Sequence, residues 1–290
     1  MNAITQKSTT ASPNHKNPFL VGRVLANGDL RASIEKVVNL VGGFRQVINP
    51  GDTVTIKPNL NTADPFPASS DPHFIKALGE AILDAGASKL RIVDSSTLRV
   101  STRKVAEKIG LTTVAEELNA ELIFLDEHPW VKQKFPQAKH LKTASIGKPA
   151  LDCEKLVLAP CLKTHRFARF TASLKLFVGW MKPQDRFKMH LGKLEYKLVD
   201  LASFFQPALI VMDARKCFVT NGPTSGQIET PNVIMASHDM VAIDVVGVRI
   251  LQSYNANNRL DLPIWELPQI QHAVALGLGA SKDEDIRVIE

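Results

Sequence analysis

The chain has 290 residues, of which 44% are hydrophobic, so it is long enough and apolar enough to bury a large core. Its apolar runs stay below the roughly 18 residues of a transmembrane helix, and residues 1–17 lack the apolar stretch of a signal peptide. We therefore expect a cytoplasmic protein without a membrane partner. The three cysteines form no C-x-x-C pair, which argues against a disulfide framework and a thiolate zinc site.

The positive charge of the chain is concentrated in one segment. The whole chain carries a net charge of +6 at pH 7, and residues 163–197 contain nine basic residues against two acidic ones. The rest of the chain is therefore close to neutral. Localised positive charge indicates an anionic partner, whereas a solvated helix face would explain any single lysine or arginine.

Short apolar segments alternate with helical patterns along the chain. Residues 1–17 are polar and predict a disordered tail, and a single α/β domain is expected over 18–290. The predicted strands cover 19–26, 53–56, 89–93, 121–125, 155–159, 208–212 and 233–236, and the predicted helices cover 29–40, 72–85, 171–180, 195–205 and 240–251. This alternation is typical of a largely parallel sheet covered by helices on both faces.

Polar side chains follow five of these strands, at the point where each strand ends. They are Lys57 and Asn59; Asp94, Ser95 and Ser96; Lys163 and His165; Asp213; and Ser237, His238 and Asp239. Because the carboxyl ends of parallel strands meet at one edge of a sheet, we expect a polar crevice there. Helix capping would explain one or two of these residues. It does not explain Lys57 or Lys163, because a cation at the start of a helix opposes the helix dipole.

A set of short motifs and single residues is spread along the chain. They are Lys57-Pro58-Asn59, Asp94-Ser95-Ser96, Lys163-Thr164-His165, Ser173-Leu174-Lys175, His190, Asn221-Gly222-Pro223, Asp239, Asp244 and Gly277-Leu278-Gly279. On these motifs the chain resembles the uncharacterised family catalogued as domain of unknown function 362. Leu176 and Ala214 depart from the asparagine and glycine that its members usually have. The resemblance implies no particular reaction, and because the ferredoxin-like cysteines of some members are absent, no iron–sulfur cluster is expected.

The candidate catalytic residues are Lys163, His165, Lys175 and His190. Imidazole can serve as acid, base or ligand near neutral pH, and lysines can neutralise carboxylate or phosphate groups. Ser173 and Lys175 are two apart on a predicted helix and point in different directions, so one of them can be structural. The candidate substrate-binding residues are Lys57, Asn59, Asp94, Ser95, Ser96, Asp213, Asn221, Gly222, Asp239 and Asp244.

The cofactor is left open by the sequence. If a divalent metal binds, its candidate ligands are His165, His190, Asp94 and Asp213, although their spacing matches no named metal motif. The glycine motifs of standard nucleotide phosphate sites are absent. The loop at 220–226 can either hold an oxyanion or simply form a turn.

Three functions remain open. We favour an enzyme acting on a small anionic substrate, a carboxylate or a phosphate, in a site lined by Lys, His and Asp. The alternative is a nucleic-acid or nucleotide-binding protein that uses residues 163–197, with interleaved aromatics for stacking. However, Phe170, Phe177 and Trp180 recur at helical spacing, which favours core packing. A lesser alternative is a metal-dependent, racemase-like enzyme, because the order His165, Lys175, His190 is similar to that of lactate racemases.

Asp244 lies in a helical stretch that is apolar on all sides, so we expect its carboxylate to be buried. A buried charge needs a partner. Either the carboxyl is protonated or it is paired with a cation, and we predict an ion pair with Lys57, Lys163 or Lys175. A further alternative is hydrogen bonding to neighbouring backbone.

Overall fold

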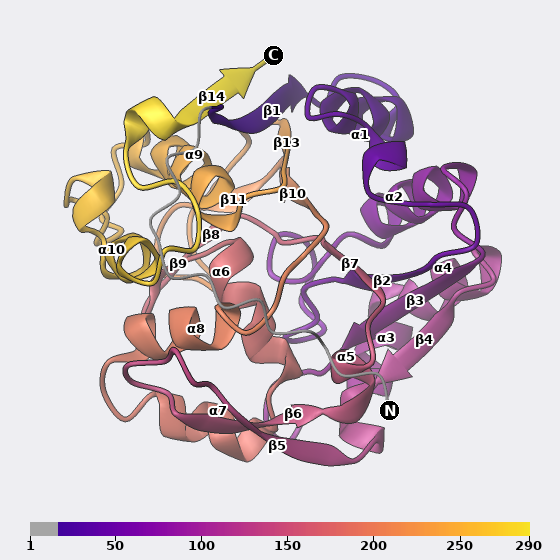
Figure 1. Cartoon of the computed structure of the whole chain (residues 1–290), viewed down its shortest axis with the longest axis horizontal. Coiled ribbons are helices and arrows are strands. Elements are labelled where there is room, and N and C mark those ends of the chain that lie inside the picture. The colour runs from indigo at the N-terminus through magenta and orange to yellow at the C-terminus, as the bar shows by residue number, and fades with distance from the viewer. Residues whose placement is uncertain (1–16) are drawn as a thin grey trace.

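A computed structural model describes residues 17–290, so the predicted tail lies outside the described residues except for Asn17. Within this range the main sheet has eight strands, in the order β14-β1-β13-β10-β7-β2-β3-β4 (Figure 1). Their bounds are β1 (Phe19–Leu25), β2 (Thr53–Lys57), β3 (Lys89–Asp94), β4 (Glu121–Phe124), β7 (Lys155–Leu158), β10 (Leu209–Ala214), β13 (Val233–Ser237) and β14 (Ile286–Ile289).

The sheet is mostly parallel, which confirms the predicted fold class. In the described part of the chain seven of these strands run in one direction, and only β13 runs against its neighbours β10 and β1. All six residues of β10 are buried, as expected for a strand covered on both faces. That burial explains why residues 209–212 form a continuous apolar run rather than an alternating one.

The reversed direction of β13 corrects one prediction. Ser237, at the carboxyl end of β13, pairs with Ile210 near the start of β10, and Val233 pairs with Ala214 at the end of β10. The residues after β13 therefore lie at the opposite edge of the sheet from the other strand exits. Asp239 and the residues beside it do not join the predicted crevice.

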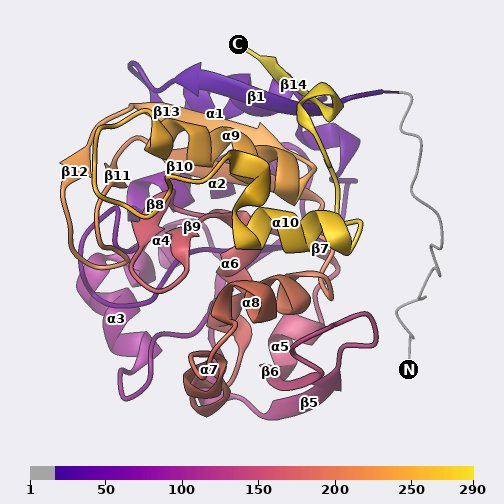
Figure 2. The same cartoon turned by 90° about the vertical axis from the view of Figure 1, so that its left-hand side faces the viewer.

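Helices cover both faces of the sheet (Figures 1 and 2). One face packs against α1 (Leu30–Asn39), α2 (Pro72–Asp84) and α4 (Leu111–Glu117), and the other against α6 (Ser173–Leu176), α8 (Leu194–Ala202), α9 (Met240–Gln252) and α10 (Pro268–Ala275). The local sequence explains several of these elements. Asp71 caps α2 by accepting a hydrogen bond from the backbone of His73, and Pro72 occupies its first turn.

Shorter elements fill the connections. They are the helices α3 (Thr102–Ile109), α5 (Lys148–Leu151) and α7 (Pro183–Met189) and the two-stranded pairs β5 (Trp130–Lys134) with β6 (Thr143–Gly147), β8 (Lys163–His165) with β9 (Arg169–Thr171), and β11 (Cys217–Phe218) with β12 (Ile228–Glu229). The helix expected over 171–180 is split into α6 and a 3₁₀ turn at Phe177–Trp180. Among residues 17–290, no helix is both long and apolar enough to cross a membrane.

Candidate functional site

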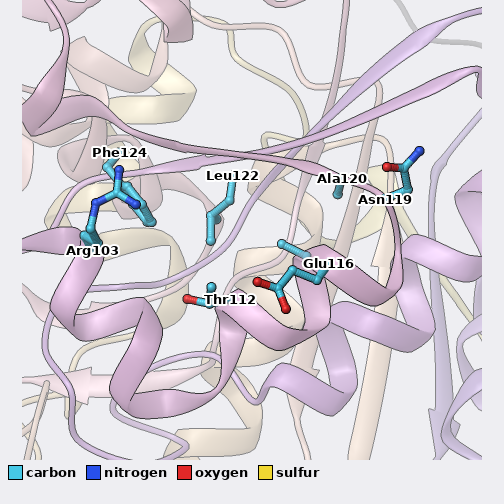
Figure 3. Close-up of a pocket in the computed structure, with 8 residues that line it drawn as sticks. Arg103, Thr112, Glu116, Asn119, Ala120, Leu122 and Phe124 are labelled. Atoms are coloured by element: carbon cyan, nitrogen blue, oxygen red, sulfur yellow. The ribbon is translucent and has the colours of Figure 1, made fainter.

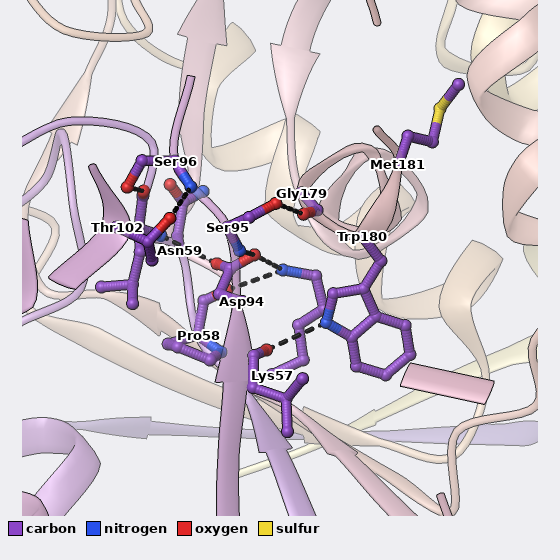
Figure 4. Close-up of polar contacts among 12 residues, drawn as sticks. Lys57, Pro58, Asn59, Asp94, Ser95, Ser96, Thr102, Gly179, Trp180 and Met181 are labelled. Atoms are coloured by element: carbon purple, nitrogen blue, oxygen red, sulfur yellow. Dashed lines mark hydrogen bonds and ion pairs between the residues drawn. The ribbon is translucent and has the colours of Figure 1, made fainter. Parts of the chain in front are cut away.

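Lys57 and Asp94 form a buried ion pair at the ends of two adjacent parallel strands (Figure 4). The ammonium of Lys57 lies 2.7 Å from the Asp94 carboxylate, and the two side chains are 1% and 2% exposed. The carboxylate also accepts backbone hydrogen bonds from Leu60 and Ser95. Burial lowers the pKa of Lys57, and the charge of Asp94 opposes that effect. The sequence correctly placed both residues at one edge of the sheet. The structure shows that their charges neutralise each other.

The turn at Phe177–Trp180 packs directly on this pair. A Cβ on Gly179 would clash with the Asp94 carboxylate and would lie 2.8 Å from the Lys57 ammonium, so only glycine fits there. The indole of Trp180 donates a hydrogen bond to the Val93 carbonyl, and the Lys57 ammonium lies 5.7 Å from its ring centre. Figure 4 shows Gly179 and Trp180 beside Lys57 and Asp94.

Arg186, on α7, is a site residue that the sequence analysis did not single out. Its guanidinium is nearly buried and donates hydrogen bonds to the carbonyls of Met181, Ser95, Ser96 and Gly179 and to the Ser95 hydroxyl. All three of its side-chain nitrogens are therefore used within the protein. Arg186 holds the exit of β3 against the turn after α6, and its charge adds to the positive potential nearby.

Lys163, on β8, holds down the loop that follows β2. The residue is 1% exposed, and its ammonium donates hydrogen bonds of 2.7 and 2.6 Å to the carbonyls of Pro67 and Ala68. Burial lowers the pKa of Lys163 to about 8. This residue combines a buried positive charge with two neutral acceptors, which leaves its charge uncompensated.

His165 is held in one neutral tautomer. Its Nδ1 accepts hydrogen bonds from the backbone N–H groups of Phe167 and Ala168, so in the neutral ring the proton resides on Nε2. Burial depresses the pKa of His165 far below its usual range, and the nearby charges of Lys175 and Lys163 act in the same direction. His165 is therefore a hydrogen-bond donor through Nε2 rather than a general base at that atom.

Lys175 differs from the other lysines of the site. It lies on α6 and is partly exposed, and its ammonium has no hydrogen-bond or ion-pair partner within residues 17–290. Burial and, to a smaller extent, the charges of Lys163, Arg186 and Lys57 together lower the pKa of Lys175 to about 7. At neutral pH this amine can both accept and release a proton.

Asp244 is buried as predicted, but the predicted ion pair is wrong. Its carboxylate accepts hydrogen bonds from the Ser173 backbone at 2.8 Å, the Ser173 hydroxyl at 2.6 Å and the Leu174 backbone at 3.0 Å. The two backbone donors belong to the first residues of α6. Their N–H groups have no partner within the helix and are therefore available to a carboxylate. Asp244 and Ser173 therefore position the helix that carries Lys175.

Asp213 and the loop at 220–226 are also engaged in internal contacts. Asp213 is buried and pairs with Arg215, which also pairs with Asp71 at the start of α2. Gly222 has a φ of 60°, and a Cβ there would collide with the carbonyl of Thr164. Asn221 is exposed, and the Gly222 carbonyl accepts a hydrogen bond from the backbone N–H of Arg166, the residue after His165. These residues support the site rather than forming its interior.

The remaining predicted residues are dispersed. Asn59 pins its loop through backbone bonds with Ser70, and Asp239 caps α9 at the far edge of the sheet. His190 is exposed at the end of α7, and its ring stands edge-on to Phe167 at 5.8 Å.

The four predicted metal ligands do not form a metal site. Within residues 17–290, no cluster of three or more His, Cys, Asp or Glu side chains is arranged to hold a metal ion. Asp94 is paired with Lys57, Asp213 is paired with Arg215, and the Nδ1 of His165 already accepts two hydrogen bonds. The donor set therefore does not fit the metal that the sequence analysis left open.

A surface hollow elsewhere on the protein is separate from this site (Figure 3). Its lining comes from α3, α4 and β4 and includes Arg103, Thr112, Glu116 and Phe124. None of the candidate site residues contributes to it. The guanidinium of Arg103 lies over the ring of Phe124 at 4.6 Å and is also paired with Glu127, so its charge is already compensated.

The cations of the site outnumber the carboxylates that neutralise them. Lys57 is paired with Asp94, but within the described residues no carboxylate forms an ion pair with Lys163, Lys175 or Arg186. Buried charges are normally paired. An uncompensated group of this kind favours binding of an anion from solution.

Comparisons with known proteins agree with the fold. A family model described as "Domain of unknown function (DUF362)" matches residues 54–249. A thylakoid-associated protein of Synechocystis sp., sll1697, is 27% identical over 233 residues, which cover 78% of this chain and 71% of that protein.

Among solved structures, the lactate racemase apoprotein from Thermoanaerobacterium thermosaccharolyticum is similar, with a TM-score of 0.53 and 12% sequence identity. The match covers 82% of this chain and 58% of the racemase chain, so this protein spans little more than half of that structure. At this level of identity the likeness concerns the fold alone.

Proposed function

Because the chain belongs to the DUF362 family, whose description specifies no reaction, we propose its function from the geometry of the site. We infer that the protein is an enzyme that binds a small carboxylate or phosphate anion beside Lys175 and His165. The observation that carries this proposal is the excess of buried or half-buried cations over carboxylates around Lys175.

The side chains suit distinct roles in such an enzyme. Lys163 and Lys175 would attract and neutralise the anion, because an uncompensated charge in a protein interior interacts strongly with an opposite charge. The Nε2–H of His165 would donate a hydrogen bond to an oxygen of the substrate and stabilise negative charge that develops there. Lys175, whose pKa is lowered to about 7, would carry the proton.

Nucleic-acid binding has less support. The basic segment does not form one continuous surface, because Lys163 and Arg186 are buried and Arg169 is paired with Glu195. The aromatic rings of Phe170, Phe177 and Trp180 are fully buried, as the helical spacing predicted, and are not available for stacking on bases. We therefore keep nucleic-acid binding as an outcome of the tests below.

A racemase-like activity stays a lesser proposal. The relative with a similar fold is called a lactate racemase apoprotein, and lactate is a small carboxylate of the class proposed here. The candidate metal ligands of this chain do not come together, so no metal-dependent step is derived. Cytoplasmic location likewise remains an expectation, since one relative is called thylakoid-associated.

Thermal unfolding with and without added anions tests the proposal. We expect phosphate, lactate or pyruvate to raise Tm, because a ligand that binds the folded state stabilises it, and glycerol to have no effect. Lys175→Gln should abolish the response, whereas Lys188→Gln should retain it, because the Lys188 side chain is 72% exposed. An unchanged Tm with every anion would refute the anion site.

The same protein should be titrated with single-stranded RNA at low and moderate salt. Weak binding is expected. Micromolar binding that falls steeply with salt would favour the nucleic-acid alternative, because several phosphates would then release counterions together.

A further inference from the structure

We propose that Lys175 is a nucleophile that forms an imine with small anions carrying an aldehyde or ketone, so that the substrates of this site are oxo acids. This inference rests on the proposed function, because the anion must first bind beside Lys175. It adds a substrate class and a covalent step to that function.

The first argument is the state of the three lysines. The Lys57 ammonium donates to the Asp94 carboxylate and the Pro58 carbonyl, and the Lys163 ammonium donates to two carbonyls. Lys175 has no such partner among residues 17–290, and it is the one of the three that is partly exposed. An amine that donates no hydrogen bond can present its nitrogen lone pair to a ligand.

The second argument is electrostatic. Nearby positive charges and burial together favour the neutral amine of Lys175, whose pKa is lowered to about 7. About half of these amines are then unprotonated at neutral pH, compared with a very small fraction of ordinary lysines. Burial is the larger cause of this shift, and the neighbouring positive charges that add to it would also attract a carboxylate. Desolvation beside a second cation is an established way to activate a lysine for imine formation.

The third argument is the position of α6. Asp244 anchors its first residues through hydrogen bonds to Ser173 and Leu174, and the turn after it is fixed by Arg186 and by the Trp180 indole. A nucleophile needs such a rigid support, because small displacements from the reacting geometry are costly in rate. A structural helix would need the same anchors, but it would gain nothing from a lysine without a partner.

His165 supplies the remaining group. Its neutral Nε2–H can donate a hydrogen bond to the substrate carbonyl oxygen, and its ring is close enough for the charge of Lys175 to lower its pKa. Polarisation of the carbonyl by a neutral donor avoids placing another positive charge beside the amine.

The step is balanced without a further reactant. The Nζ lone pair attacks the carbonyl carbon, and the carbonyl π electrons move to oxygen, which takes up a proton, giving a carbinolamine. The hydroxyl then takes up a second proton and leaves as water, while the nitrogen lone pair forms the C=N bond. Over the two stages the nitrogen releases both of its protons to solvent or to the departing oxygen, and a neutral imine remains. No atom is oxidised or reduced, and addition of water reverses the step.

Reductive trapping tests the inference. The full-length protein is incubated with pyruvate and sodium cyanoborohydride, digested, and analysed by mass spectrometry. The peptide containing Lys175 should gain the mass of pyruvic acid less one oxygen atom. Lactate, which has no carbonyl, should give no adduct, and acetone, which has no charge, should label Lys175 far more slowly than pyruvate.

Matched variants complete the experiment. Lys175→Arg keeps the positive charge and should lose the adduct, whereas Lys188→Arg should be labelled at Lys175 like the parent. If pyruvate and lactate both raise Tm but pyruvate forms no adduct at Lys175, the imine is refuted and the anion site stands. If no anion raises Tm and no adduct forms, both proposals fail. Labelling of Lys188 and Lys175 at equal rates would also overturn the inference.

Discussion

Removal of the Lys175 charge should stabilise the free protein, which is the opposite of the usual effect of a substitution in a folded domain. The pKa of Lys175 falls from 10.5 to about 7, and each unit corresponds to about 1.36 kcal/mol of free energy. Because the side chain is partly exposed, solvent screening reduces the cost of holding its charge to about 2 kcal/mol. Lys175→Met removes that charge and retains a side chain of similar length.

The pH dependence follows from proton binding. Between about pH 7 and 10.5 the unfolded chain keeps the Lys175 proton that the folded protein has lost, so stability rises with pH in this window. Below about pH 7 both states are protonated, and the folded protein bears the full cost of the charge. The advantage of Lys175→Met should therefore be largest below about pH 7 and fade as the pH approaches 10.

Urea unfolding at several pH values, in a chloride buffer without polyvalent anions, measures this difference. Lys188→Met is the matched control and should stay within about 0.5 kcal/mol of the parent, because its side chain is 72% exposed. Added phosphate should narrow the gap between the parent and Lys175→Met, since only the parent retains the full site. If Lys175→Met is no more stable than the parent at any pH, the amine is not the unpaired cation described here.

Three further variants test the supports of the site by urea unfolding. Lys57→Met should cost about 3–5 kcal/mol, because it leaves the buried Asp94 charge without its cation, and adding Asp94→Asn should recover part of that loss. If the double variant costs the sum of Lys57→Met and Asp94→Asn measured singly, the pair is not coupled. Gly179→Ala should cost about 1–3 kcal/mol through overpacking against the same pair, and an unchanged stability would mean that the pair can shift freely. Asp244→Ala should cost more than Asp244→Asn, because only the amide oxygen can still accept from Ser173; the reverse order would contradict the anchoring of α6.

Much of the architecture could be predicted because it depends on local patterns. The apolar segment at 53–56 and the helical pattern at 72–85 match β2 and α2 to within one residue at each end. Alternation of such segments requires a mostly parallel sheet, because parallel neighbours need a crossover helix. The placement of Lys57 and Asp94 at the carboxyl ends of β2 and β3 followed from the same patterns.

The direction of β13 could not be predicted from the sequence. The sequence of β13 has the apolar character of a buried strand whichever way it runs, so nothing local distinguishes a parallel from an antiparallel neighbour. The prediction of a largely parallel sheet took the five strands with polar exits to run in one direction, and it therefore placed Asp239 wrongly. The short pairs β5–β6 and β8–β9 were also missed, because each is brief and carries polar residues among apolar ones.

By itself, the sequence determined the α/β class, the burial of Asp244 and the concentration of positive charge in one segment, because each follows from residue types at short spacing. Only the tertiary structure decided which polar groups meet. Asp244 binds the start of α6 rather than a lysine, Asp94 takes Lys57, and Lys175 is left without a partner. Asp244 and Ser173 are separated by 71 residues, and Lys57 and Asp94 by 37. Pairing across such separations is set by the packing of whole elements, so no local pattern encodes which cation remains free to bind an anion.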